Sequence, residues 1–423
     1  MNAFVLKGHI CHSRSENTIE ITENGYLVVE NGVCRGVYPT LPERWAGLPL
    51  TDYGDRIILP GMSDLHLHAP QFAFRGLGMD MELLDWLNTY TFPEESKYRD
   101  PEYADRAYES FTQHLRRSTT TRAVVFATIH VPATELLMDK MDKAGLRGFV
   151  GKVNMDRNSP DYLCETSCAQ AIEDTERWIC ETNEKYAGIR PILTPRFIPT
   201  CTDELMRGLR GLLEKYRLPV QSHLSENFGE IAWVQELCPS SKFYGDAYDS
   251  FGMFGGDHLC VMAHCVHSGE AEIELMKKNG VFIAHSPESN INLSSGVAPI
   301  SKYLELGLNV GLATDVAGGS HESMLRAMMH AIQASKLRWR LKDESVKALT
   351  VDQAFYLATA GGGSFFGKVG RFDEGYDCDA VVLDDGNLDH PQPLSVRARL
   401  ERMIYLADER NILAKYVAGK QLF

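Results

Sequence analysis

The sequence predicts an α/β fold, a (β/α)8 barrel of the TIM type joined to a small β-sandwich domain that the two chain ends form together. Three observations predict it. Apolar runs of strand length alternate with amphipathic segments of helical period, which is typical of a parallel sheet. Eight such runs lie between Arg56 and Asp315, and a barrel of this kind usually takes about 250 residues. Both ends of the 423-residue chain carry strand signals without helical period.

The eight expected barrel strands share a short apolar core. They are RIILPGMSDLHLH, TRAVVFATIH, RGFVGKVNMD, IRPILTPRF, LPVQSHLSE, HLCVMAHCV, VFIAHSP and NVGLATD. Segments with helical spacing lie between most of them, such as PEYADRAYESFTQHLRRS, TDELMRGLRGLLEKY and GEAEIELMKKN. An open doubly wound sheet is the alternative, but no GxGxxG follows the first strand to support it.

The chain ends are expected to pair with each other. Residues 1–58 predict short strands with turns at ENG, NGV and YGD, and short strands return from about Lys368 in DCDAVVLDD and AKYVAGKQLF. We therefore expect residues 1–58 and 368–423 to form one small β domain, and residues 59–367 to form the barrel.

The composition excludes several kinds of partner. The chain has 43 Lys and Arg against 57 Asp and Glu, a formal net charge of -14, which argues against nucleic acid or an anionic membrane. No apolar stretch approaches the roughly 18 to 20 residues of a membrane helix, and MNAFVLKGHICHS has too short an apolar core for a signal peptide. We expect a cytoplasmic protein that acts on a small molecule. Its ten cysteines include no CxxC pair and are expected to be reduced thiols.

Two histidines one residue apart end the first expected barrel strand. In a strand, His66 and His68 project to the same face, whereas on a helix they would lie about 200° apart. The carboxyl ends of barrel strands are where barrel enzymes have their active sites. The strand assignment therefore allows both imidazoles to bind one metal ion.

Other expected strands end in polar residues at the same rim, namely His223, Glu226, His264 and Asp315. Any one of them, taken singly, is explained by a hydrogen bond at a strand end, but the convergence of so many metal-capable groups indicates a metal site. Three imidazoles and one carboxylate suit Zn²⁺, with Fe²⁺ as the second choice, and leave an open position for water.

Glu226 has two interpretations. It lies three residues past His223, where it is placed to face the water of the metal site and to move protons. It is equally suited to the N-cap or first turn of the next helix, where the helix dipole favours an acid. The two roles are compatible.

With these residues in view, the chain resembles the amidohydrolase superfamily and, within it, the guanine deaminase family. The HxH pair and the strand-ending Asp are shared across the superfamily. WLNTYTFPEE and TPRF are more specific, and ATIH, VGKVNMD, SHLSEN, MAHC, LATDVAGG and RMIYLADERNI are also similar. The resemblance implies zinc-dependent hydrolysis of guanine to xanthine and ammonia, in purine catabolism or salvage.

The resemblance also implies individual roles. The metal ligands are His66, His68, His223 and Asp315, for one Zn²⁺ per subunit or Fe²⁺ in its place. The catalytic residues are Glu226, His264 and Asp315. The substrate contacts are Gln71, Arg196 and Phe197, together with His223 and Glu226. Without the resemblance, Arg196 would be interpreted as a rim salt bridge and Phe197 as core. The similarity of ERMIYLADERNI leads us to expect a homodimer.

Some positions depart from the family pattern. Glu288 stands where a small or amide residue is usual, Pro70 where Ser is common, and Gly229 where an acid is common. Binuclear relatives carry a bridging carboxylated lysine at the end of strand four. That strand has none here, and Lys152 in strand three is a poor substitute, so we expect one metal ion.

Three other functions share some of these features. A deaminase or hydrolase of the same fold that acts on 8-oxoguanine, cytosine, an adenosine compound or a triazine is the nearest, and the residues of TPRF and HAPQ favour guanine over these. The unrelated zinc deaminases use H-x-E with P-C-x-x-C, and the chain has no PCxxC. A silent scaffold barrel is expected to have lost ligands or the proton shuttle, and every one of them is present.

Overall fold

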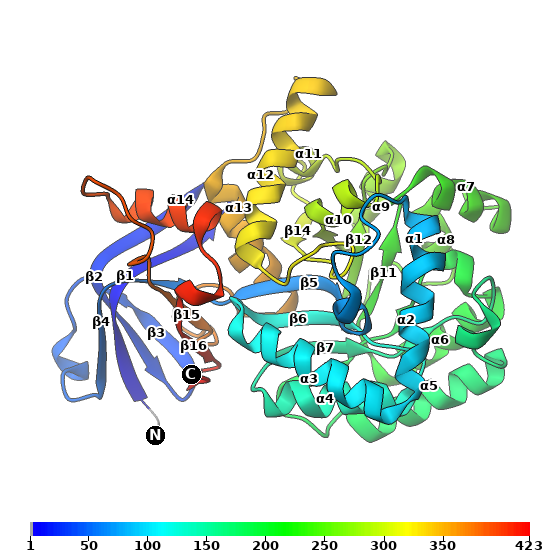
Figure 1. Cartoon of the computed structure of the whole chain (residues 1–423), viewed down its shortest axis with the longest axis horizontal. Helices are drawn as coiled ribbons and strands as arrows, with labels where there is room; N and C mark the ends of the chain where they lie inside the picture. The colour runs from blue at the N-terminus through cyan, green and yellow to red at the C-terminus, as the bar shows by residue number, and fades with distance from the viewer. Residues whose placement is uncertain (1–2) are drawn as a thin grey trace.

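The computed structural model describes residues 3–423. The middle of the chain contains eight parallel strands (Figure 1). Four form a sheet in the order β5 (Met62–His68), β6 (Thr120–Phe126), β7 (Arg147–Gly151), β9 (Ile189–Pro191). Four more form a second sheet in the order β11 (Val220–Leu224), β12 (Cys260–His264), β13 (Phe282–His285), β14 (Asn309–Leu312). Each predicted run contains one of these strands, which confirms the expected alternation. Two short strands, β8 (Val153–Asn154) and β10 (Thr194–Pro195), pair just beyond β7 and β9.

Backbone hydrogen bonds join the two sheets at both edges. On one side the amide of Gln221 donates to the carbonyl of Leu193 at 3.0 Å. On the other side the amide of Asp315 donates to the carbonyl of His66 at 2.9 Å, and the amide of His68 donates to the carbonyl of Val316 at 2.8 Å. The paired ladders themselves remain two sheets of four strands. The carboxyl ends of β5, β11, β12 and β14 therefore lie close together.

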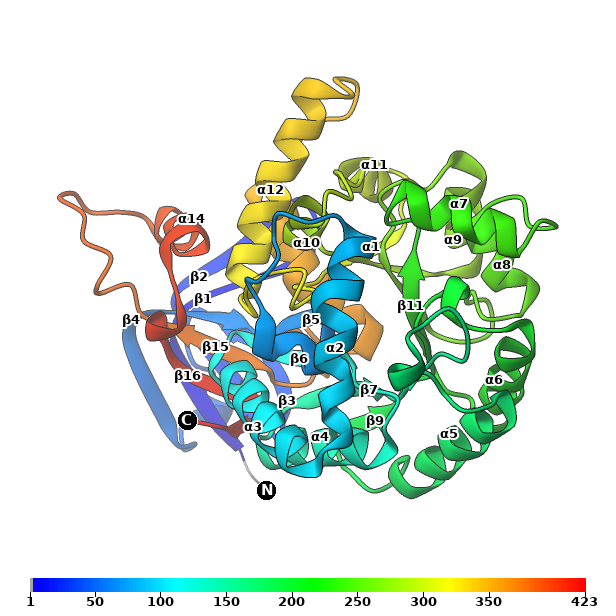
Figure 2. The ribbon, with the colours of Figure 1, turned by 45° about the vertical axis from the view of Figure 1, so that its right-hand side comes forward.

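Helices cover the outside of these strands, as α3 to α6 show in Figure 2. The helices are α1 (Leu83–Trp86), α2 (Phe92–Ser96), α3 (Pro101–Arg117), α4 (Val131–Lys143), α5 (Cys168–Thr182), α6 (Asp203–Tyr216), α7 (Phe228–Leu237), α8 (Tyr244–Ser250), α9 (Glu270–Asn279), α10 (Pro287–Asn292), α11 (Ile300–Glu305), α12 (Met324–Leu341), α13 (Val351–Tyr356) and α14 (Val396–Leu406). The three predicted helical segments are confirmed as α3, α6 and α9. Local chemistry sets their ends: Asp100 caps α3 ahead of Pro101, and Thr202 caps α6.

Shorter helical turns connect several elements. They are η1 (Glu43–Trp45), η2 (Ala69–Phe74), η3 (Leu87–Thr91), η4 (Lys97–Arg99), η5 (Asp161–Leu163), η6 (Ile198–Thr200), η7 (Leu357–Gly361), η8 (Ser364–Phe366) and η9 (Glu409–Asn411). The turn η3 has π-helical geometry and joins α1 to α2.

The two chain ends form one mixed sheet in the order β17-β16-β15-β4-β1-β2-β3 (Figure 1). Its strands are β1 (Ala3–Ser15), β2 (Thr18–Glu30), β3 (Val33–Tyr38), β4 (Leu50–Pro60), β15 (Ala380–Leu383), β16 (Ile412–Val417) and β17 (Lys420–Gln421). Antiparallel pairing of β15 with β4 connects the carboxyl end to the amino end. All seven strands lie in this single sheet, so a second facing sheet is not seen in residues 3–423, and the sandwich stays a prediction. Met1 and Asn2 of the predicted segment 1–58 lie outside the described residues.

Three details of the terminal segments differ from the prediction. The strands β1 and β2 each run for 13 residues, so the expectation of short strands was wrong there. The turns predicted at ENG and YGD were wrong, since ENG lies inside β2 and YGD inside β4. Asn24 and Gly54 take positive φ of 51° and 59° without ending these strands. The NGV turn is confirmed, with Asn31 and Gly32 at φ of 53° and 81° between β2 and β3. The helix α14 was not predicted.

The first predicted barrel strand is divided in two at Gly61. Residues up to Pro60 belong to β4 in the terminal sheet, and the barrel strand β5 begins at Met62. A Cβ atom at Gly61 would lie 2.3 Å from the side chain of Thr121, so the crossing from one sheet to the other needs glycine.

Buried polar contacts fasten the terminal sheet to the barrel. Arg122 on β6 donates from Nε to Asp379 Oδ2 at 2.6 Å, and both side chains are buried. Lys415 on β16 is also buried, and its Nζ donates to the carbonyls of Leu115, Arg116 and Ser118 at 3.0 to 3.1 Å, around the end of α3. These contacts hold the two parts of the chain in one arrangement.

Two further expectations concern the whole chain. No helix within residues 3–423 is long and apolar enough to cross a membrane. All ten cysteines lie in the described part of the chain and are free thiols, most of them buried, as predicted.

Candidate active site

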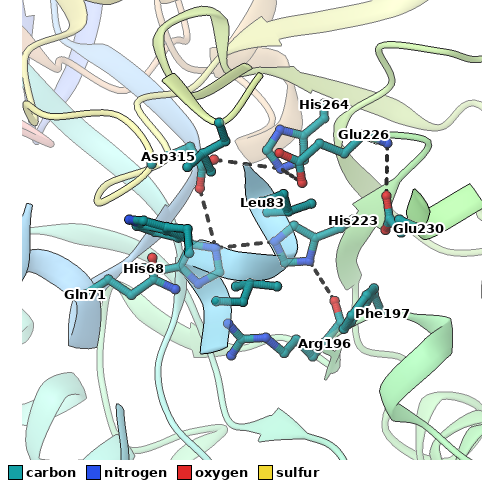
Figure 3. A pocket seen from close by; sticks show the side chains of 14 residues that line it. His68, Gln71, Leu83, Arg196, Phe197, His223, Glu226, Glu230, His264 and Asp315 are labelled. Carbon is teal, nitrogen blue, oxygen red and sulfur yellow. Dashed lines mark hydrogen bonds and ion pairs between the residues drawn. The ribbon is translucent and has the colours of Figure 1, made fainter. Parts of the chain in front are cut away.

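Five predicted site residues meet at the carboxyl ends of β5, β11, β12 and β14, namely His66, His68, His223, His264 and Asp315. Figure 3 shows the last four of them. His68 Nε2 lies 3.2 Å from His66 Nε2 and 3.3 Å from His223 Nε2. Asp315 Oδ1 lies 3.1 Å from His66 Nε2 and 3.5 Å from His68 Nε2. His264 Nε2 lies 3.7 Å from Asp315 Oδ2. The structure therefore brings together the three imidazoles and the carboxylate that were predicted as ligands, with His264 beside them.

Turned backbone at the strand ends directs these side chains inward. His264 and Asp315 have φ of 74° and 48°, and Ser225, one residue past β11, has φ of 47°. Such positive φ is uncommon for residues other than glycine and costs on the order of 1 kcal/mol or more at each position. Strained residues of this kind cluster at functional sites.

Burial keeps the ligand imidazoles neutral. It lowers the pKa of His66, and it acts together with the neighbouring imidazoles to bring the pKa of His68 and His223 well below the ordinary value. Burial alone would raise the pKa of Asp315, but the imidazoles around it outweigh that effect and lower its pKa. Neutral imidazoles and an ionised carboxylate are the forms that bind a metal ion.

The donor set fits a divalent cation. Two overlapping groups, His66 with His68 and Asp315, and His66 with His223 and His264, each place their ligand atoms within 4.8 Å of one another. His223 Nδ1–H donates to the carbonyl of Arg196 at 2.6 Å, which leaves the lone pair of Nε2 facing the other imidazoles. Nitrogen lone pairs that face one another at this range are suited to hold a cation between them.

Glu226 lies next to this cluster and is buried. Its Oε1 accepts a hydrogen bond from the hydroxyl of Ser295 at 3.0 Å, and its Oε2 lies 3.4 Å from His264 Nε2. Burial raises the pKa of Glu226. Asn227 caps α7 and Glu230 completes its capping box, so the N-cap interpretation of Glu226 was wrong. The residue precedes the helix and faces the cluster.

His264 is held by partners on both ring nitrogens. Its Nδ1–H donates to Asn290 Oδ1 at 2.9 Å, and its Nε2 faces Glu226 and Asp315. Burial opposes a charge on this ring, but the two carboxylates outweigh that effect and raise the pKa of His264.

The predicted substrate contacts lie on the opposite wall of the cavity. Gln71, on η2, donates from Nε2 to Glu95 Oε1 at 2.9 Å, and Arg196 donates from Nη1 to Glu95 Oε2 at 2.6 Å. Phe197 follows Arg196, and its ring centroid lies 6.4 Å from that of His223, edge to face. These three side chains line one cavity together with His68, His223, Glu226, His264 and Asp315 (Figure 3).

Several lining or supporting residues were missed by sequence reasoning. The cavity wall also includes Leu83, Trp86, Leu87, Glu230, Leu293 and Gly318. For Glu230 a signal was present, because the pattern of Asn227 followed by Glu230 is that of a capping box. The other residues follow no local sequence pattern, because only the folded chain brings them to the cavity.

Two residues singled out from the sequence make contacts of their own. Lys152 is buried in an ion pair with Glu165, so it is engaged away from the cluster. The carboxylate of Glu288 accepts from the hydroxyl of Ser320 and lies 3.5 Å from His330 Nδ1.

Comparison with known proteins agrees with this geometry. Residues 57–422 match the model of the amidohydrolase family. The chain belongs to the amidohydrolase family. Amidohydrolases are metal-dependent, which agrees with the donor set above.

Among members of the amidohydrolase family, the chain is similar to guanine deaminases. It is 35% identical to guanine deaminase of Dictyostelium discoideum, over 99% of this chain and 98% of that protein. It is 38% identical to guanine deaminase of Rattus norvegicus, over 86% of this chain and 82% of that protein. A crystal structure of guanine deaminase from C. acetobutylicum, with bound guanine in the active site, is 47% identical and superposes with a TM-score of 0.97 over 100% of both chains.

Proposed function

We propose that the protein is a guanine deaminase, a hydrolase that converts guanine and water to xanthine and ammonia in purine catabolism or salvage. One observation carries the proposal: members of a metal-capable cluster, a buried carboxylate and two hydrogen-bond donors line a single cavity. The similarity to guanine deaminases over the whole chain, including one with guanine in its active site, supports the same substrate.

The metal ligands in this proposal are His66, His68, His223 and Asp315, and they hold one Zn²⁺ per subunit, with Fe²⁺ as the second choice. Three imidazoles and one carboxylate are a zinc donor set that leaves a position open. When bound, zinc lowers the pKa of a coordinated water from 15.7 to about 7. The ion pair of Lys152 with Glu165 supports a single metal ion, because that lysine is already engaged.

Glu226 is the proton shuttle. Hydrolytic deamination adds water to C2 of the purine and expels nitrogen, so a proton must leave the water and later reach the departing amine. The carboxylate of Glu226 takes one proton from the attacking water and passes it to ring N3. It then takes the proton of the hydroxyl now on C2 and gives it to the amine, so that NH3 leaves and the C2 oxygen becomes a carbonyl. A raised pKa suits a group that acts first as base and then as acid. The hydroxyl of Ser295 keeps one oxygen fixed, so the other is directed at the reacting atoms.

His264 and Asp315 orient the attacking water. The contact of Nδ1 with Asn290 fixes the His264 ring so that Nε2 points at the reaction centre, where Asp315 also lies. Arg196 binds O6 of the purine and stabilises the electron-rich intermediate with its charge. Gln71 contacts another edge of the ring, and Phe197 packs against the ring face. His223 and Glu226 complete the substrate contacts.

The architecture that we propose is a (β/α)8 barrel of residues 59–367 with a small β domain of residues 1–58 and 368–423. The hydrogen bonds between the two four-stranded sheets at both edges support a single barrel. We propose further that the enzyme is a cytoplasmic homodimer. Exposed apolar residues on and after α14, Leu406 and Leu413 among them, support an interface near that helix.

The direct test is a substrate panel. The zinc-loaded protein is incubated with guanine, and ammonia release is followed together with the ultraviolet change to xanthine, with 8-oxoguanine, cytosine and adenine in parallel. Rapid xanthine formation is expected, with little turnover of adenine because it lacks O6 and carries its amine on C6 instead of C2. No turnover of guanine together with turnover of another amine would show that the substrate is a different heterocycle. Appreciable turnover of adenine would contradict the role of Arg196.

A further inference from the structure

One buried carboxylate, Glu95, holds both polar substrate contacts at once. It lies on α2, with 1% of its surface exposed. Its two oxygens are divided between two partners: Oε1 accepts from Gln71 Nε2 at 2.9 Å and Oε2 accepts from Arg196 Nη1 at 2.6 Å. The guanidinium of Arg196 also lies over the ring of Phe92, one turn earlier, at 5.2 Å. Glu95 does not line the cavity itself and reaches it through these two side chains.

The partners of Gln71 determine which way its amide faces. Both oxygens of Glu95 are acceptors in these contacts, so the atom of Gln71 that faces Glu95 is the amide nitrogen. On the other side, the backbone N–H of Ala317 donates to Gln71 Oε1 at 3.3 Å. Both neighbours require the same orientation, with the oxygen of Gln71 directed at a donor of the protein. The second N–H of the amide is then the group available to a ligand.

Arg196 likewise has donors only. Because Glu95 takes one nitrogen of its planar fork, the direction of the remaining N–H groups is set by the same carboxylate. Glu95 also supplies the negative charge that a buried guanidinium needs. The two polar contacts therefore present N–H donors to the cavity, which matches a ligand edge made of acceptors, such as a carbonyl oxygen beside ring nitrogens.

We propose that Glu95 is a positioning residue that determines the specificity of the cavity for purines with an oxo group. The inference rests on the function proposed above. The segment that carries Glu95 also supplies Leu83, Trp86 and Leu87 to the cavity wall, through α1 and η3. The apolar wall and the setting of the two donors are thus connected by one short stretch of chain.

The test compares guanine with 2-aminopurine, which keeps the C2 amine but lacks O6. In Glu95→Gln the side chain keeps its shape, but only one of its terminal atoms still accepts, so Gln71 and Arg196 are no longer both satisfied. We expect kcat/KM for guanine to fall about 10- to 100-fold, the range of a charged hydrogen bond. The kcat/KM for 2-aminopurine is expected to fall much less. The specificity ratio, which is kcat/KM for guanine divided by kcat/KM for 2-aminopurine, therefore falls about tenfold. Zinc content should stay that of the wild type.

Glu94→Gln is the matched control. Glu94 is the preceding residue, is also buried, and bonds Tyr103 and Lys97 instead of the site residues. This variant is expected to keep the wild-type ratio. Glu95→Asp keeps the charge but is one methylene too short to reach both partners, and its ratio of kcat/KM for guanine to kcat/KM for 2-aminopurine is expected to fall as well. If Glu95→Gln does not fold, the ratio measured for Glu95→Asp tests the role of Glu95.

The outcomes separate the two proposals. A wild-type protein that does not deaminate guanine would overturn the proposed function. A wild-type protein that deaminates guanine, with folded Glu95 variants that bind zinc and keep the wild-type ratio, would overturn the role of Glu95 alone.

Discussion

Burial sets the chemical state of three clustered imidazoles and of Glu226. His66, His68 and His223 are neutral because burial lowers the pKa of each ring, while Glu226, in the same cavity, has its pKa raised by burial. The same physical cause thus provides neutral ligands for a metal ion and a carboxyl group suited to proton transfer.

The role of Glu226 leads to a prediction about a single atom. Glu226→Gln keeps the size of the side chain but removes its ability to take and return a proton. We expect turnover of guanine to fall by at least about 10²-fold, while zinc binding is retained, because the ligand set is untouched. Steady-state kinetics and metal analysis of the same sample measure both. Near-normal turnover would contradict the shuttle.

At this scale the sequence predicted the residues that occur in patterns. His66 and His68 share a strand face, and His223, His264 and Asp315 end apolar runs, so alternation and rim position identified them. Glu95, Asn290 and Ser295 could not be found in this way, because each acts on a site residue that lies far from it in the sequence. Only the folded chain shows that Asn290 accepts from His264 and Ser295 donates to Glu226.

At the scale of elements, buried polar contacts decide how the terminal sheet meets the barrel. Arg122 on β6 pairs with Asp379, just before β15, and neither side chain is exposed. Arg122 also pairs with Asp377 at 2.8 Å, so removal of the Asp379 charge takes away one of its two ion pairs.

Asp379→Asn is therefore expected to lower the free energy of unfolding by about 1.5 to 3 kcal/mol, the range for hydrogen bonds to a charged group, as measured by urea titration. Arg14→Gln is the control, since Arg14 pairs with Asp373 at the surface, and loss of an exposed pair costs less than about 1 kcal/mol. Equal stability of Asp379→Asn and wild type would show that the pair does not fasten the two parts.

The elements themselves were predictable where periodicity was strong. The eight barrel strands and the helices α3, α6 and α9 follow from apolar spacing alone. The boundary at Gly61 was not predictable from the sequence, because β4 and β5 form one continuous apolar run. Only the close approach of Thr121 shows that the chain changes sheet there. The turn signal at Asn24 was also misleading, since a long strand accommodates one residue of positive φ.

The whole molecule presents apolar surface beside α14. Tyr405, Leu406 and Leu413 are exposed there, and α14 projects near α12 on one side of the molecule (Figure 1). Interaction sites are often marked by exposed apolar residues, so this is the region where we expect the interface of the proposed dimer.

Size-exclusion chromatography with light scattering is expected to give twice the chain mass of 47.4 kDa. Leu406→Glu should shift the protein toward the monomer, because a buried charge opposes association. Leu259→Glu is the control. Leu259 is also exposed, but it lies just before β12 in the barrel and not on or next to α14 in the sequence. A monomeric wild type would contradict the dimer.

The number of metal ions that guanine turnover requires is the most direct test of the site. Metal-free protein is titrated with zinc while xanthine formation from guanine is measured. Activity should be absent at the start, rise in proportion to added zinc and level off at one zinc per subunit, because one set of three imidazoles and one carboxylate holds the ion. Xanthine formation without any metal ion, or a rise that continues to two per subunit, would contradict a single catalytic metal held by His66, His68, His223 and Asp315.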